Sequence, residues 1–93
     1  MNNPNTLSRL NALSLSQVSE KENLLHAIEE LGELSVLLIK TVNKGILSTF
    51  DLVDEVSDNY VMLSRLIAMY DIGVQVNARV DYKTERQIER LTQ

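Results

Sequence analysis

Four carboxylate side chains form two pairs with helical spacing, Glu30-x-x-Glu33 and Glu55-x-x-Asp58. A helix turns about 100° per residue, so two residues three apart project from the same face. Both pairs lie within apolar stretches that are expected to form the core of a helical hairpin. Ionised carboxylates in such a place repel one another and lose solvation unless a cation lies between them. The pattern therefore indicates a metal site.

The two pairs lie at matching distances from Gly45, which is expected to end the first long helix. Counting back from Gly45, Glu33 and Glu30 are 12 and 15 residues away. Counting forward, Glu55 and Asp58 are 10 and 13 residues away. At a rise of about 1.5 Å per residue, an antiparallel hairpin places the pairs nearly level. We therefore expect the four carboxylates to converge.

The ligand types available select a hard cation. The chain has no cysteine and one histidine, so oxygen atoms dominate, and these favour Mg²⁺ or Mn²⁺. Mg²⁺ commonly bridges carboxylates to substrate phosphates and orients a water for in-line attack. His26 precedes Glu29 by three residues, the reverse of the Glu-x-x-His order of di-iron bundles, and is interpreted as a structural or substrate-edge residue. The alternative for either acidic pair alone is a solvated helix face.

Periodicity and capping residues predict the elements that carry these side chains. Ser19 followed by Glu22 matches a capping box, and Gly45 and Gly73 suit helix ends. Three helices are expected, from about residue 16 or 19 to 43, from 48 or 49 to about 72, and from about 76 to 91. Residues 1–15 are expected to form an arm or a short helix, and residues 16–93 the helical domain. The predicted class is all-α: an antiparallel hairpin plus a C-terminal helix, assembling into an oligomeric core of the four-helix-bundle type.

Composition limits the kind of protein. The chain has 93 residues, 44% of them hydrophobic and 24% charged, which is typical of one folded domain. No basic segment followed by an apolar run opens the sequence, and the apolar run 34–39 is too short to span a membrane. Lack of cysteine suits the cytoplasm. The same run is apolar on nearly every side, which predicts a homo-oligomer with this run in the interface.

Charge is distributed unevenly around a net value of −4. Seven of the thirteen acidic residues lie between residues 29 and 58, and four of the nine basic residues lie in the last fifteen. These four are spaced as one helical stripe: Arg79, Lys83, Arg86 and Arg90. An acidic centre beside a basic tail suits a metal-bridged polyphosphate better than a nucleic acid. Lys83 and Arg86 are candidate phosphate ligands, with Arg65 a third; the alternatives are a solvated stripe and an Arg65 that covers the core.

The spacing of the acidic residues resembles a family signature. Two acidic segments are separated by a gap of twenty-one residues: Glu29-Glu30-Leu31-Gly32-Glu33 and Glu55-Val56-Ser57-Asp58. Together they resemble the EExxE…ExxD motif of the MazG-like all-α NTP pyrophosphohydrolases. The resemblance covers roughly residues 16–91. It implies that Glu30, Glu33, Glu55 and Asp58 bind Mg²⁺. Glu29 matches the motif and is a further catalytic candidate, which orients water or faces solvent.

The same resemblance implies an activity. A nucleoside triphosphate would be cleaved to monophosphate and pyrophosphate, to cleanse or trim a nucleotide pool, by a dimer or a dimer of dimers. Two departures are visible. The chain has no Trp to stack on a base, which leaves Phe50, Tyr60 and Tyr82 as substitutes, and Ala27-Ile28 replaces the Lys typical of phosphoribosyl-ATP pyrophosphohydrolases. The main alternative is a non-enzymatic helical interaction module with a relic or structural metal site, and metal storage ranks third.

Overall fold

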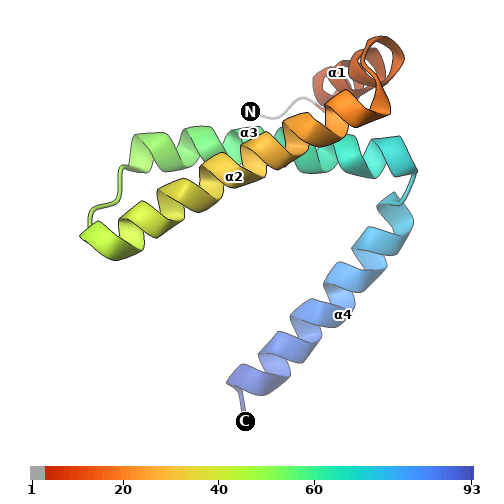
Figure 1. Cartoon of the computed structure of the whole chain (residues 1–93). Helices are drawn as coiled ribbons and strands as arrows, with labels where there is room; N and C mark the ends of the chain where they lie inside the picture. The colour runs from red at the N-terminus through yellow and green to blue at the C-terminus, as the bar shows by residue number, and fades with distance from the viewer. Residues whose placement is uncertain (1–3) are drawn as a thin grey trace.

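A computed structural model describes residues 4–93 and confirms the all-α class (Figure 1). Its helices are α1 (Pro4–Gln17), α2 (Glu20–Lys44), α3 (Thr49–Tyr70) and α4 (Gly73–Leu91). Helices α2 and α3 form the expected antiparallel hairpin, and α1 packs against its open end. Helix α4 extends away and contacts only α3 among the described helices. None of the described helices is both long and apolar enough to cross a membrane.

Local capping determines the ends of α2, as the sequence predicted. The Ser19 hydroxyl accepts a hydrogen bond from the backbone N–H of Glu22 at 3.1 Å. At the other end Gly45 has a φ of 69°, and its N–H donates to the Thr41 carbonyl at 2.8 Å. This left-handed conformation has little steric cost for glycine. Ser48 caps the start of α3 in the same way as Ser19 caps α2.

The junction between α3 and α4 differs from the prediction. Helix α3 ends at Tyr70, and Asp71 rather than Gly73 takes the left-handed conformation, with a φ of 51°. Gly73 is instead the first residue of α4, so the prediction that it stops α3 was wrong. An Asp tolerates this conformation because its short polar side chain can satisfy nearby backbone groups. Consequently α4 begins three residues earlier than expected, and Val74 is helical.

The N-terminal segment is a full helix held to the hairpin by polar contacts. The Asn11 amide donates to the Ser64 hydroxyl of α3 at 2.9 Å. The Ser14 hydroxyl donates to Asn23 at the start of α2 at 2.8 Å. Asn11 and Asn23 are both buried, so these bonds are partly shielded from water. Of the segment expected as an arm or short helix, residues 1–3 lie outside the described part.

The apolar core of the single chain is small. Only Ala27 and Met62 are buried hydrophobic residues among those described, whereas many Leu, Ile and Val side chains are exposed. The chain has an accessible surface of 7515 Å². A compact monomer of the same mass is expected to expose roughly 5,400 Å². The chain therefore presents far more surface than a self-contained domain of its size.

Candidate metal centre

The hairpin brings together the four carboxylates of the two acidic pairs. Glu30 and Glu33 come from α2, and Glu55 and Asp58 come from α3. One carboxylate oxygen of each residue lies within 4.8 Å of those of the other three. Oxygen ligands on opposite sides of Mg²⁺ are about 4 Å apart, so small side-chain movements would complete a ligand set.

Two buried oxygens of this four-carboxylate cluster have no hydrogen-bond donor. Within the described part of the chain, Glu30 Oε2 and Glu55 Oε2 are buried and accept no hydrogen bond. The Glu30 side chain as a whole is 14% exposed. A buried carboxylate oxygen without a donor has lost its hydration with no compensation. The donor set, oxygen only and rich in negative charge, fits a hard divalent cation.

Burial and, after it, nearby like charges raise the pKa of two members of the cluster. Burial raises the pKa of Glu30 above 4.5, and the charges of Glu33 and Asp58 raise it further, while His26 acts in the opposite direction. Burial also raises the pKa of Glu55 above 4.5, again with Glu33 and Asp58 contributing. Both shifts mean that the ionised carboxylates are disfavoured in the metal-free fold. A cation at this site would therefore have to compete with protons.

The raised pKa values predict how pH affects stability without metal. In the folded chain Glu30 and Glu55 bind protons more tightly than in the unfolded chain, whose reference pKa is 4.5. The unfolding free energy contributed by these groups therefore increases as pH falls from neutral through the raised pKa values toward 4.5. In EDTA, thermal unfolding followed by circular dichroism should show a melting temperature that rises from pH 7.5 to pH 5.5.

A double variant, Glu30→Gln with Glu55→Gln, is the matched control for this pH dependence. It lacks the two titrating groups, so its melting temperature should rise less over the same pH range. Saturating Mg²⁺ should likewise flatten the profile of the native chain, because the ion favours the ionised carboxylates. A native profile in EDTA with the same slope as the double variant would contradict the prediction.

A buried arginine supports Glu30 through a histidine. Arg65 is 6% exposed, and its Nη1 lies 3.4 Å from His26 Nδ1. A guanidinium only donates, so Nδ1 must accept and the ring proton lies on Nε2. His26 Nε2 lies 3.4 Å from Glu30 Oε1, within ion-pair distance. Arg65 thus orients a member of the cluster through His26, and its guanidinium lies beside His26 and Met62 rather than at the surface expected of a phosphate ligand.

A buried amide fixes the two helices at the level of the cluster. Asn59 is 4% exposed, and its Nδ2 donates to the backbone carbonyls of Glu30 at 3.1 Å and Glu55 at 2.8 Å. One side chain therefore joins α2 to α3 where the carboxylates meet. Sequence reasoning missed this residue, although a polar Asn directly after Asp58 on a mainly apolar helix face was a visible signal.

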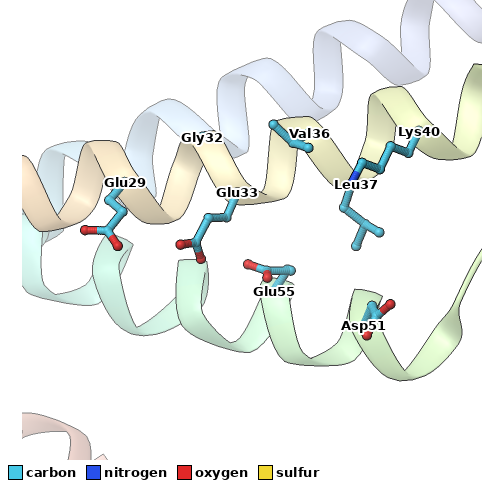
Figure 2. A pocket seen from close by; sticks show the side chains of 8 residues that line it. All are labelled: Glu29, Gly32, Glu33, Val36, Leu37, Lys40, Asp51 and Glu55. Atoms are coloured by element: carbon cyan, nitrogen blue, oxygen red, sulfur yellow. The ribbon is translucent and has the colours of Figure 1, made fainter.

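A cavity of about 520 Å³ adjoins the cluster between α2 and α3 (Figure 2). Glu33 and Glu55 belong to both, and they point toward each other across the gap. The other lining residues are Glu29, Gly32, Val36, Leu37, Lys40 and Asp51. This volume lies within the range of about 300–1,000 Å³ that is typical of small-molecule sites. The cluster thus lies at the wall of a space large enough for a ligand.

Of the remaining predicted site residues, some line the cavity and others lie away from it. Glu29 lines the cavity but lies outside the four-carboxylate cluster. Lys83 and Arg86 lie on α4, which does not contact α2, and neither lines the cavity. Arg86 instead borders a separate groove of α4. Lys40 is the basic residue that lines the cavity, and its spacing of seven residues from Glu33, two helical turns, was the signal for it.

Comparison of the chain with protein-family models, curated proteins and solved structures gives no match. The site is therefore defined by its own geometry. It is an acidic cluster at the wall of a cavity between the two helices of an all-α hairpin.

Proposed function

We propose that this chain is a Mg²⁺-dependent nucleotide pyrophosphohydrolase that cleaves a (d)NTP to (d)NMP and pyrophosphate. The carrying observation is the convergence of four carboxylates, two with buried unpartnered oxygens, beside a ligand-sized cavity. The similarity of the acidic motif to the MazG-like signature supports the same reaction. Removal of unwanted nucleotides from the cytoplasmic pool is the corresponding role, and the absence of cysteine is compatible with that location.

Each part of the site has a task in this reaction. Glu30, Glu33, Glu55 and Asp58 would hold the ion, which when bound neutralises phosphate charge and activates a water. Asn59 keeps α2 and α3 in register, and the Arg65–His26 pair orients Glu30. Glu29, at the cavity wall, accepts hydrogen bonds from water or substrate. Lys40 places a positive charge near the phosphates.

The bond that is broken tests the assignment. Incubation with a panel of canonical and damaged (d)NTPs and Mg²⁺, with products resolved by phosphorus NMR, should show nucleoside monophosphate and intact pyrophosphate. Orthophosphate and nucleoside diphosphate as the sole products would refute the assignment, as would turnover in excess EDTA. Metal binding without turnover of any nucleotide would favour the interaction module.

Comparison of Lys40 with the basic stripe of α4 tests where the phosphates bind. Lys40→Ala should lower kcat/KM at least about tenfold, because a cation that stabilises developing phosphate charge would be lost. Within one chain Lys83 and Arg86 lie outside the cavity, so Lys83→Ala and Arg86→Ala should have an effect this large only if α4 of another copy reaches the site. Glu85 is an exposed residue of α4, so Glu85→Ala controls for general disruption of that surface. A full loss with Arg86→Ala and none with Lys40→Ala would return the phosphate contacts to the stripe.

We further propose that the enzyme is a dimer or a dimer of dimers. The chain exposes roughly 2,100 Å² more than the surface expected for a monomer of its mass. Two copies that bury this excess would hide roughly 4,200 Å², which is within the range of obligate homodimers. The run 34–39 supplies apolar side chains to such an interface, since Leu38 and Ile39 are exposed in the single chain and lie outside the cavity.

A further inference from the structure

One position on the cavity wall carries no side chain. Gly32 lies in the middle of α2 and lines the cavity. A Cβ built at Gly32 would meet no other atom within 4 Å, so packing of the chain does not require glycine there. Its backbone is not in the left-handed conformation either, since Gly45 is the glycine with positive φ. Glycine weakens a helix interior relative to alanine, so its presence at this position has no explanation within the fold of one chain.

The cavity wall formed by α2 has two different sides. Glu33 points toward Glu55 and forms the charged side (Figure 2). Gly32 is rotated about 100° from Glu33 around the helix axis. Val36, four residues after Gly32, lies on the same ridge, so bare backbone and an apolar side chain adjoin there. We call this ridge, Gly32 and Val36, the open flank.

The two sides suit different parts of one ligand. Phosphates belong on the charged side, where a cation and Lys40 can neutralise them. A flat apolar group gains most from the open flank, because an aromatic ring can lie against backbone where no Cβ projects. Glu29 also lines the cavity and lies about one helical turn before Gly32. Its carboxylate can accept hydrogen bonds from N–H groups at the edge of an aromatic ring or from the O–H groups of a sugar.

We propose that the open flank seats the nucleoside part of the substrate, and that Gly32 sets how closely the base and sugar approach α2. This inference depends on the proposed nucleotide pyrophosphohydrolase function and extends it from the phosphates to the nucleoside. Side chains introduced at position 32 then exclude the nucleoside while leaving the phosphate site intact. Gly32 is thereby a specificity-determining position.

Two probes separate the nucleoside from the phosphates in a binding experiment. The first is the tightest-binding member of a panel of α,β-methylene nucleoside triphosphates, and the second is methylene diphosphonate, both titrated calorimetrically with Mg²⁺ present. Gly32→Ala should lower the affinity for the nucleotide analogue by about tenfold, and the larger Gly32→Leu should lower it further. The added side-chain carbons would occupy the space that the nucleoside needs. Affinity for methylene diphosphonate should stay within about twofold in both variants.

Two other variants make the result specific. Gly73→Ala is the matched control, because its Cβ would make only an ordinary 3.6 Å contact with Ile67 and it lies outside the cavity. It should change neither affinity. Lys40→Ala should lower the affinity for both probes, because both carry the phosphate-like groups that Lys40 would contact. The Gly32 variants should melt at or above the native temperature, because alanine and leucine favour a helix interior more than glycine.

The possible outcomes are distinct. Equal weakening of both probes by Gly32→Leu would place phosphate, not nucleoside, on the open flank and overturn the inference. Unchanged affinity for both probes in Gly32→Leu would overturn it as well. A native chain that binds neither probe with Mg²⁺ would refute the proposed function itself, and the inference with it.

Discussion

Replacement of Glu33 by Gln, or of Asp58 by Asn, is expected to lower Mg²⁺-dependent turnover by roughly a thousandfold. Each change removes one negative charge from the group of four carboxylate oxygens that lie within 4.8 Å of one another. The neutral amide keeps the size of the side chain but is a far weaker ligand for a hard cation. Steady-state kinetics with Mg²⁺ titration, combined with calorimetric metal binding, measures the loss directly.

The same two variants should remain folded and, without metal, melt at a higher temperature than the native chain. Burial and, after it, the charges of Glu33 and Asp58 raise the pKa values of Glu30 and Glu55, so removal of one of these charges relieves repulsion. Asp81→Asn is the matched control, since Asp81 is an exposed acidic residue on α4 outside the cluster. Full activity in both Glu33→Gln and Asp58→Asn would show that the metal ligands lie elsewhere.

The second large effect is expected on self-association. Leu38→Glu or Ile39→Glu should weaken the dimer at least a hundredfold, about 2.7 kcal/mol, because a carboxylate would have to be buried in an apolar interface. Leu38 and Ile39 are 46% and 58% exposed in the single chain. Analytical ultracentrifugation over a range of concentrations measures the shift. Because the core of one chain is so small, helicity should fall together with association.

The control for this experiment adds the same charge elsewhere. Gln87→Glu introduces a carboxylate on the exposed surface of α4 without removing an apolar side chain. It should sediment like the native protein. A native chain that sediments as a stable, folded monomer at micromolar concentration would contradict the proposed assembly.

Local sequence rules predicted much of this fold because the interactions behind them are local. Ser19 and Gly45 end α2 through bonds to residues within four positions. The level placement of the acidic pairs followed from counting residues along two antiparallel helices. The stop at Asp71 was missed because both Asp and Gly can adopt a left-handed conformation, and sequence alone favoured the glycine.

The parts of the site that could not be predicted depend on partners far apart in the chain. Arg65 meets His26 across 39 residues, and Asn59 reaches the Glu30 carbonyl across 29. The sequence offered Arg65 as a phosphate ligand or as a cover for the core, but it gave no information about the partner of the guanidinium. The direction of α4 was equally hidden, because its few contacts with α3 leave the position of the basic stripe to the tertiary structure.

The polar attachment of α1 has a consequence for the order in which the chain opens. Directional amide and hydroxyl bonds from Asn11 and Ser14 fix the position of the helix, but each contributes only about 1 kcal/mol. We therefore expect α1 to unfold locally at a lower free energy than α2 and α3, and its amides to exchange with solvent before theirs. The hydrogen bonds of Asn59 join α2 to α3 without involving α1. Helix α1 can therefore dissociate reversibly while α2 and α3 stay packed together at the carboxylates.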